Sequence, residues 1–314
     1  MKYLTKKTYW PILYTFDSIG KLLFKNKKEI PKKLRKALFI RLEHIGDVIM
    51  ATPAFESFKK NNPGCEVHVL CRTLTKPLLE NNPFVDKIIT YDAPWFIKRS
   101  GDKQKKLREL VKELRKERYD VAFEMHGDPR NNYIAYKTGA YSVGYSCRGG
   151  GFFLSKTVEY NENLNMVRQN LNLIKNFAKI SNSKPKIYSD NKSIEKAEEI
   201  MKEYGLKKKE FVIINPISGR KDKDMTKEEV EKAISGNRKY KIVITGSKDQ
   251  RIANDIYKSA INLCGETDLL TLTEIVRKSR KVIAPDTGII HIAKAVGTPF
   301  EAIYKTTDKN VWGY

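Results

Sequence analysis

Residues 282–299 constrain the fold most, because an apolar run is followed by a polar turn and then by small and apolar residues at helical spacing. This order predicts a strand, a tight turn and a helix that begins at Thr287 and Gly288. The first N–H groups of such a helix lack partners within it, and the helix dipole adds about half a positive charge there. Asp286, in the turn, and His291, one helical turn further on, are expected to face the same crevice. The segment predicts an anion site that suits a diphosphate; the alternative is an ordinary helix cap by Asp286.

A second segment, residues 37–55, has the same order of strand, turn and helix in the other half of the chain. With 314 residues, of which 40% are hydrophobic, the chain can bury two cores of ordinary size. We therefore expect an α/β fold with two Rossmann-like domains, each a doubly wound parallel sheet, facing a cleft. Because ligands lie beyond the carboxyl ends of such strands, Asp47 and Asp286 should open toward this cleft.

The expected elements alternate along the chain. Strands are expected at residues 38–42, 67–70, 87–90, 120–125, 211–214, 241–245 and 281–283. Helices are expected at residues 103–118, 165–179, 192–204, 226–234, 250–259, 270–278 and 289–296. The glycine-rich residues 129–151 are expected to form irregular structure, and the polar residues 181–186 to link the domains.

The net charge of +23 requires an explanation, and nucleic acid, an anionic membrane or a phosphorylated substrate would each supply one. Residues 1–36 hold many lysines against only Asp17 and Glu29, mixed with aromatic and aliphatic side chains. That mixture is typical of a helix at a membrane interface, so we predict that this segment binds an anionic membrane surface. The alternative is a helix that packs on the body of the protein and exposes a solvated lysine face.

The sequence predicts a cytoplasmic protein, peripheral at the inner face of the cytoplasmic membrane. No apolar run approaches the ~18 residues that span a bilayer, and the first residues lack the pattern of a signal peptide. The four cysteines are scattered, so we expect free thiols. No aspartate cluster has the spacing of a metal site, so we predict no metal.

Five motifs together resemble glycosyltransferase family 9, the bacterial heptosyltransferases that move heptose from ADP-heptose onto lipopolysaccharide core. These are residues 37–55, 119–130, 215–219, 282–299 and 312–314. The resemblance implies a GT-B fold and an inverting, metal-independent transferase with no cofactor beyond its nucleotide-sugar. It also implies an acceptor-binding domain at residues 37–182 and a nucleotide-sugar-binding domain at 183–314, after the basic amphipathic extension at 1–36.

The resemblance also implies roles for individual residues. Asp47 matches the aspartate that follows glycine in the family's first motif and is implied as the catalytic base. Donor contacts are implied for Ser218, Gly219, Lys223, Asp249, Asp286, Thr287, Gly288 and His291. The candidate acceptor contacts follow strands of the first domain, where arginine forks suit phosphate or carboxylate groups on a glycolipid. They are Arg72, His126, Asp128, Arg130 and Arg148.

The chain departs from the family pattern at three places. Met225 stands where relatives carry a tryptophan, so Arg220 or Lys221 could share the role of Lys223. Lys248 occupies the position of the ribose-binding carboxylate, and Asp249 is the nearest substitute, which leaves the nucleotide open. The chain also ends near the motif's tryptophan and glycine, so we expect the final bridging helix to be missing.

Other interpretations remain at this point. Asp47 could only cap its helix, and the lysines could be solvated surface charges. A nicotinamide-dependent oxidoreductase lacks support because no Gly-x-Gly-x-x-Gly turn follows a first strand. A nucleic-acid-binding protein would account for the charge, but no binding motif is present, and we predict no nucleic-acid partner. A transferase-like protein that binds a nucleotide-sugar without turnover is the remaining alternative.

Overall fold

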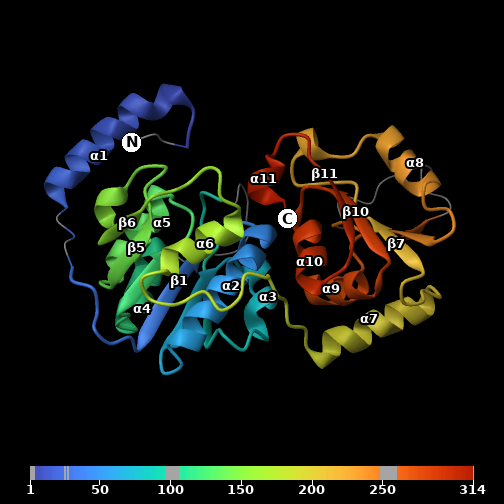
Figure 1. The fold of residues 1–314 in the computed structure, drawn as a ribbon, viewed down its shortest axis with the longest axis horizontal. Helices are drawn as coiled ribbons and strands as arrows, with labels where there is room; N and C mark the ends of the chain where they lie inside the picture. Colours follow the sequence, from blue (N-terminus) through green and yellow to red (C-terminus); the bar gives the residue numbers. More distant parts are fainter. Residues whose placement is uncertain (1–3, 25, 27, 97–105, 248–259, 314) are drawn as a thin grey trace. The chain divides into compact units, whose positions relative to one another are not determined.

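The computed structural model describes residues 4–24, 26, 28–96, 106–247 and 260–313 (Figure 1). The chain divides into two compact units. The first unit comprises Met1–Glu43, Ala51–Lys76 and Pro83–Ser183, and the second comprises His44–Met50, Pro77–Asn82 and Lys184–Tyr314. Each unit contains one parallel sheet, and the two are described separately.

The first unit is built on a sheet of six parallel strands in the order β3-β2-β1-β4-β5-β6. Its strands are β1 (Lys36–Arg41), β2 (Glu66–Cys71), β3 (Lys87–Thr90), β4 (Val121–Glu124), β5 (Tyr141–Tyr145) and β6 (Lys156–Val158). Its helices are η1 (Lys7–Tyr9), α1 (Trp10–Leu23), α2 (Ile45–Asn61, whose first turns are counted with the second unit), η2 (Thr73–Thr75), α4 (Leu107–Lys116), α5 (Pro129–Lys137), η3 (Gly151–Phe153) and α6 (Met166–Ile174).

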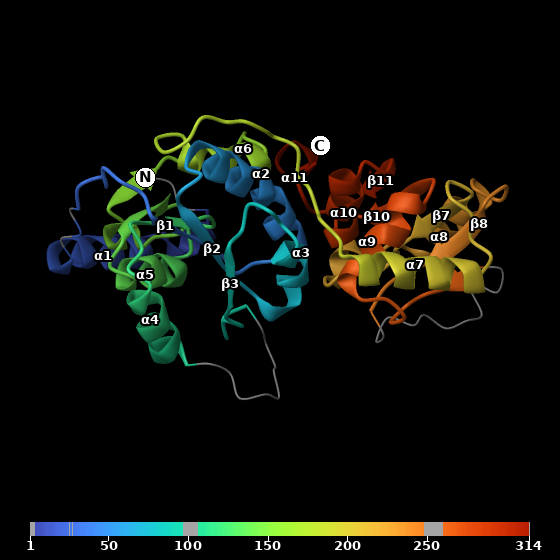
Figure 2. The same cartoon turned by 90° about the horizontal axis from the view of Figure 1, so that it is seen from below.

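Both faces of this sheet are covered, with α2 and α6 on one side and α4 and α5 on the other (Figure 2). Successive side chains of a strand point to opposite faces, and β1 shows the result. Phe39 stacks on Phe123 at 4.8 Å between ring centroids and contacts the rings of Phe55 and Phe58 on α2. The flanking residues of β1 belong to the core that includes α4 and α5. Burial on both faces explains why the central strands are continuous apolar runs.

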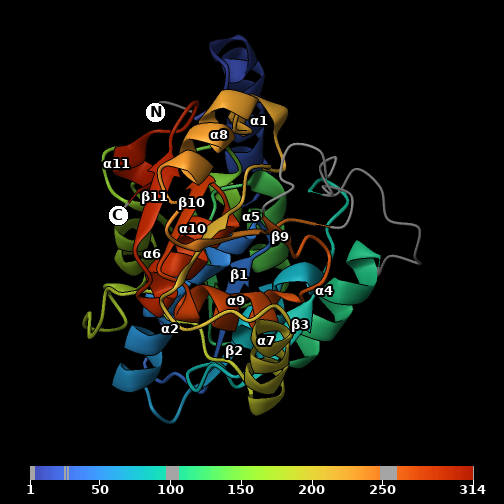
Figure 3. The ribbon, with the colours of Figure 1, turned by 90° about the vertical axis from the view of Figure 1, so that its right-hand side faces the viewer.

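The second unit has a five-stranded parallel sheet in the order β11-β10-β7-β8-β9 (Figure 3). Its strands are β7 (Phe211–Ile214), β8 (Lys241–Ile244), β9 (Ile261–Asn262), β10 (Lys281–Pro285) and β11 (Phe300–Ile303). Its helices are α3 (Pro77–Glu80), α7 (Asn191–Glu203), η4 (Lys221–Lys223), α8 (Lys227–Ser235), α9 (Leu269–Lys278), α10 (Gly288–Val296) and α11 (Lys309–Trp312).

The expectation of irregular structure at residues 129–151 is wrong, because this stretch forms α5, β5 and the start of η3. Asp128 caps α5 by accepting the N–H of Arg130, and Pro129 occupies the first turn. Gly139 and Gly149 adopt φ values of +81° and +93°, so they end elements rather than mark a loose loop. Strands β5, β6, β9 and β11 were not expected. Helix α6 ends at Ile174, because the chain then turns so that Phe177 can pack on Phe123.

Helix α1 packs on the first unit through one face. Asp17 is buried and accepts the N–H of Gly150 at 2.7 Å. A Cβ atom at Gly20 would lie 2.1 Å from the ring of Phe152, so only glycine permits this approach. The exposed side of α1 is largely apolar: Ile12 is 67% exposed and Leu22 is 78% exposed, beside the exposed Lys21. The packed helix that the sequence left open as the alternative is therefore observed, but its exposed side is more apolar than a lysine face.

All four cysteines are buried and free, which confirms the expectation of free thiols. Within the part of the chain that the structure describes, no helix combines the length and apolar character needed to cross a membrane. The expected helix at residues 250–259 lies outside the described residues.

Candidate functional site

The strand order of the second unit reverses between β7 and β10, and ligands of doubly wound sheets lie outside the strand ends at such a point. The segments that follow these two strands bring Lys223 and Asp286 together. The Nζ of Lys223 lies 3.2 Å from Oδ2 of Asp286 and 3.3 Å from its carbonyl oxygen. Only 14% and 6% of these side chains are exposed, so this is a largely buried ion pair.

The first turn of α10 lies beside this ion pair. The helix begins after Thr287, which makes no side-chain cap; its Oγ1 instead donates to the carbonyl of Pro285 at 3.2 Å. Because the carboxylate of Asp286 is paired with Lys223, the interpretation of Asp286 as an ordinary helix cap is wrong. The N-terminal turn of α10 and a lysine thus lie together at the strand ends, an arrangement that suits an anion.

The loop after β7 is held by its own polar side chains. The N–H of Ser218 donates to Oδ1 of Asp224 at 2.7 Å, and its hydroxyl shares one proton between that oxygen, 2.9 Å away, and the carbonyl oxygen of Arg220. The guanidinium of Arg220 is exposed and paired with Asp222. Gly219 is exposed, and a Cβ atom there would have no neighbour within 4 Å. Gly219 therefore borders open space, and Lys223 is better placed than Arg220 to act with Asp286.

Residues His44–Met50, which include the start of α2, belong to the second unit. Asp47 is buried at the third position of α2, where its Oδ2 accepts the N–H of His44 at 3.0 Å. A Cβ atom at Gly46 would lie 2.3 Å from the ring of His291, so glycine is required where α2 begins. Asp47 therefore does not occupy the N-cap position but bonds the N–H of the residue before the helix, and its role as a base stays a prediction.

His291 lies near both Asp47 and the Lys223–Asp286 ion pair. Its Nε2 lies 3.8 Å from Oδ1 of Asp286. Burial lowers the pKa of His291, and the charges of Asp286 and Asp47 oppose this only in part. The structure therefore brings the predicted base together with three of the predicted donor residues, Lys223, Asp286 and His291.

The strand order of the first unit reverses between β1 and β4, and a second charged group lies there. Glu43 follows β1 and His126 follows β4; Nδ1 of His126 lies 2.8 Å from Oε1 of Glu43. Asn131 donates to the same oxygen at 3.1 Å. The buried Arg41 places Nε 3.5 Å from Oε2 of Glu43. We call Arg41, Glu43, Glu124 and His126 the buried charge cluster.

The two carboxylates of this cluster differ in charge. Burial raises the pKa of Glu43, but His126 and Arg41 outweigh it and hold that pKa at about 2. Burial raises the pKa of Glu124 to about 7, although it accepts the N–H groups of His126 and Gly127. Burial lowers the pKa of His126, but Glu43 and Glu124 raise it further, so the net shift is upward. The ring of His126 stacks on Phe96 and remains 17% exposed, so its orientation is fixed while part of the ring stays accessible.

The other predicted acceptor residues differ in how they are held. Asp128 binds Arg130 through both carboxylate oxygens, at 2.9 and 2.6 Å, and Arg130 lies over the ring of Trp95. Among the described residues, the carboxylate near Arg72 is that of Asp92, whose Oδ1 lies 3.9 Å from the arginine Nε. Nε of the partly buried Arg148 has no hydrogen-bond partner among the described residues. The three arginines thus keep donors for an anion, whereas Asp128 caps a helix and orients Arg130; their role toward an acceptor stays a prediction.

Four residues near these groups were not predicted from the sequence: Arg41, Glu43, Glu124 and Tyr304. Arg41 and Glu43 lie in the first motif just before Asp47, and charged residues directly after a buried strand were the available signal. Tyr304 follows β11; burial and then the charge of Asp286 raise its pKa, so it lies close to that carboxylate. Asp249 and Lys248 lie outside the described residues. In the described ranges no three His, Cys, Asp or Glu side chains form a group that could hold a metal ion.

The sequence profile of glycosyltransferase family 9 (heptosyltransferase) matches residues 107–314. The chain is similar to lipopolysaccharide heptosyltransferase 3 of Escherichia coli, with 23% identity over 282 residues, which are 85% of this chain and 82% of that protein. A candidate glycosyltransferase of Haemophilus influenzae is 28% identical over 106 residues, which are 34% of this chain and 29% of that protein.

Two solved structures share the architecture. The family 9 glycosyltransferase of Veillonella parvula is 22% identical, with a TM-score of 0.77 over 92% of this chain and 85% of that chain. The E. coli heptosyltransferase WaaC with ADP is 15% identical, with a TM-score of 0.70 over 88% of this chain and 90% of that chain. Together with the two parallel sheets, these likenesses show a GT-B fold. Since the family profile matches well over half of the chain, the protein belongs to glycosyltransferase family 9, the heptosyltransferases, and is a glycosyltransferase.

Proposed function

We propose that the protein is an inverting heptosyltransferase that moves heptose from ADP-heptose onto a lipopolysaccharide-core acceptor without a metal ion. The observation that carries the proposal is the Lys223–Asp286 pair beside the N-terminus of α10, with Asp47 and His291 in the same unit. The ammonium of Lys223 has three N–H donors, so it can bond a phosphate while keeping Asp286. The ADP in the E. coli WaaC structure supports the choice of nucleotide.

The proposed reaction is a single displacement at the anomeric carbon of the donor heptose. The acceptor hydroxyl gives its proton to Asp47 as its oxygen bonds to the sugar, and the bond from the sugar to the diphosphate breaks. ADP leaves with the electron pair, stabilised by Lys223 and the first N–H groups of α10. A base on one face of the sugar and a diphosphate site on the other would invert the configuration.

Calorimetric titration with ADP, UDP, GDP and NAD, without added metal, tests the donor. We expect ADP to bind most tightly, and Lys223→Ala to weaken ADP binding by about tenfold or more because a largely desolvated cation is lost. Lys221→Ala is the matched control: Lys221 lies in the same short helix η4 but is exposed, so its loss should change the affinity by less than about twofold.

Three results would contradict this proposal. Tighter binding of UDP or GDP would keep the enzyme class but replace the donor. Equal losses in Lys223→Ala and Lys221→Ala would mean that general charge, rather than this site, binds the nucleotide. ADP-heptose binding without transfer to a lipopolysaccharide acceptor would favour a protein that binds the donor without turnover.

We further propose that the protein works at the inner face of the cytoplasmic membrane and that α1 contacts the lipid. The residues Ile12, Phe16, Ile19 and Leu23 recur at helical spacing on its outer face, and each is at least 41% exposed. Lysines flank this apolar stripe in the sequence, as expected for a helix that lies in an anionic interface. Because a different face of α1 packs on the first unit, α1 can meet a membrane without leaving that unit.

Vesicle sedimentation tests this contact. Ile12→Gln/Leu23→Gln removes two exposed apolar side chains of the stripe and should weaken binding to phosphatidylglycerol-containing vesicles by at least about tenfold. Leu74→Gln/Ile180→Gln is the matched control, because these residues are 55% and 57% exposed elsewhere on the first unit. Equal binding of the wild type and the α1 variant would overturn the membrane role of α1.

A further inference from the structure

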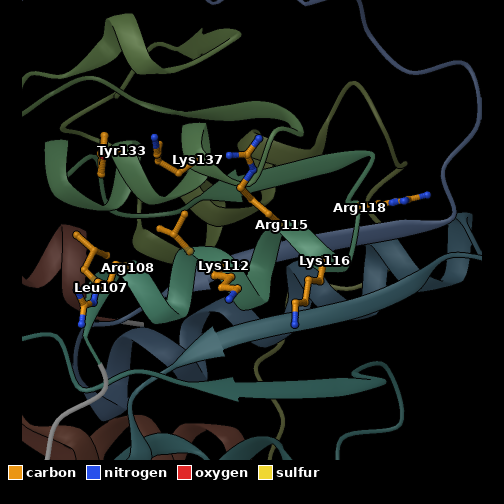
Figure 4. A pocket seen from close by; sticks show the side chains of 9 residues that line it. Leu107, Arg108, Lys112, Arg115, Lys116, Arg118, Tyr133 and Lys137 are labelled. Carbon is orange, nitrogen blue, oxygen red and sulfur yellow. The ribbon is translucent and has the colours of Figure 1, made fainter.

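A cationic groove lies between α4 and α5, apart from both strand-end groups described above (Figure 4). Its volume is about 860 Å³, and Leu107, Val111 and Tyr133 form its apolar part. Six basic residues line it: Arg108, Lys112, Arg115, Lys116, Arg118 and Lys137. Figure 4 shows the Arg115 side chain reaching from α4 toward Lys137 on α5. We call this site the α4–α5 groove.

No acidic residue is among the lining residues, all of which lie in the described part of the chain. The acids on and just after α4 have other neighbours: Glu109 accepts the N–H of Lys106, Glu113 lies close enough to Tyr119 to add to the rise that burial causes in the pKa of its hydroxyl, and Glu117 binds Lys36 and Lys87. The basic residues that line the groove therefore face no acidic lining residue in the described part of the chain. Their mutual repulsion favours any anion that enters.

The groove adjoins the segment that carries the exposed apolar stripe of α1. Phe24, at the end of α1, packs on Tyr136 of α5 with ring centroids 5.8 Å apart. Lys28 bonds the carbonyl of Gly139 just after α5; burial first and then the charge of Arg115 lower the pKa of Lys28. The views in Figures 1, 2 and 3 all draw α5 between α1 and α4. A cationic groove and an exposed apolar helix therefore lie on neighbouring parts of the same unit.

We propose that the α4–α5 groove binds the phosphate of an anionic membrane lipid headgroup while α1 contacts the acyl region. The proposal rests on the membrane role proposed for α1 and adds a second, electrostatic site to it. A headgroup phosphate matches the excess of Lys and Arg donors, and the apolar residues at the groove can contact the glycerol part of the lipid. The groove would then hold the first unit at the surface where a lipid-linked acceptor is found.

Charge reversal in the groove tests the proposal. Lys112→Glu/Arg115→Glu should weaken binding to vesicles of phosphatidylglycerol and phosphatidylcholine by at least about 30-fold, since each basic residue near such a surface contributes roughly fivefold and the new carboxylates are repelled. The matched control, Lys202→Glu/Lys207→Glu, makes the same change in net charge at exposed positions of the second unit and should lose less than about threefold. ADP titration of each variant separates this site from the donor site, because ADP affinity should stay unchanged in both.

Three further binding measurements identify which anion the α4–α5 groove binds. Pure phosphatidylcholine vesicles should bind the groove variant and the wild type alike, since α1 is intact in both. Inorganic phosphate at constant ionic strength should not displace the anionic vesicles; if it does, the groove binds free phosphate. A loss of duplex DNA binding without a loss of vesicle binding would assign the groove to nucleic acid. Either of these results, or equal losses in the groove variant and its control, would overturn the proposal.

Discussion

Asp47→Asn is expected to lower kcat by about 100-fold or more while ADP affinity stays within about threefold. An asparagine keeps the size of the side chain, and its Oδ1 can still accept the N–H of His44, so the first turn of α2 should survive. It cannot take a proton from an acceptor hydroxyl at neutral pH. Steady-state rates with ADP-heptose and calorimetry with ADP, each measured on the same preparation, separate the two effects.

A helix elsewhere in the chain supplies the control for Asp47. Glu109 occupies the third position of α4 and accepts the N–H of Lys106, which is the structural role that Asp47 has in α2. Glu109→Gln should therefore cost as much stability as Asp47→Asn, about 1 kcal/mol or less, with unchanged kcat. If Asp47→Asn lowers ADP affinity or thermal stability in proportion to kcat, Asp47 is a structural residue and the proposed base is wrong.

The central strands could be predicted because parallel strands between two helix layers are apolar on both faces. Residues 38–42 and 211–214 carry that signal, and they correspond to β1 and β7. Strand β5 has the sequence Tyr-Ser-Val-Gly-Tyr, and β9 contains only Ile261 and Asn262, so neither shows a continuous apolar run. Their place in the sheet follows from pairing with β4 and β8, which a local pattern does not contain.

The candidate site, like the fold, could be predicted from the sequence only in part. The turn at Asp286, Thr287 and Gly288 could be predicted because a strand, a turn and a helix follow one another in the sequence. The ion pair between Lys223 and Asp286 could not, since the two residues are 63 positions apart and are brought together by adjacent strands. The buried charge cluster was missed for the same reason: Glu43 and His126 follow different strands, and a charge in a buried position is tolerated only where its partner arrives from elsewhere.

The buried charge cluster leads to the prediction with the largest expected effect on stability. Glu43 is fully buried between His126 and Arg41, and its pKa falls from an ordinary 4.5 to about 2, which corresponds to roughly 3 kcal/mol of folding free energy at neutral pH. Glu43→Gln removes the carboxylate that Arg41 and His126 share, so the free energy of unfolding of the first unit should fall by about 3 kcal/mol. Urea unfolding followed by tryptophan fluorescence measures this loss. A Trp312→Phe background restricts the signal to the first unit, because the two remaining tryptophans, Trp10 and Trp95, lie there.

The pH dependence of that loss distinguishes the charge of Glu43 from its shape. A carboxylate with a lowered pKa stabilises the fold above its unfolded value, so the difference between wild type and Glu43→Gln should be full above about pH 4.5 and shrink as the pH falls toward 2. Glu124 has a raised pKa of about 7, so its stabilising protonated form is lost as pH rises from about 4.5 through 7. Glu124→Gln should therefore cost far less than Glu43→Gln at pH 7 and should remove that decline. Equal losses in the two variants at every pH, or no rescue by Glu43→Asp, would mean that Glu43 acts by packing rather than by pairing with His126 and Arg41.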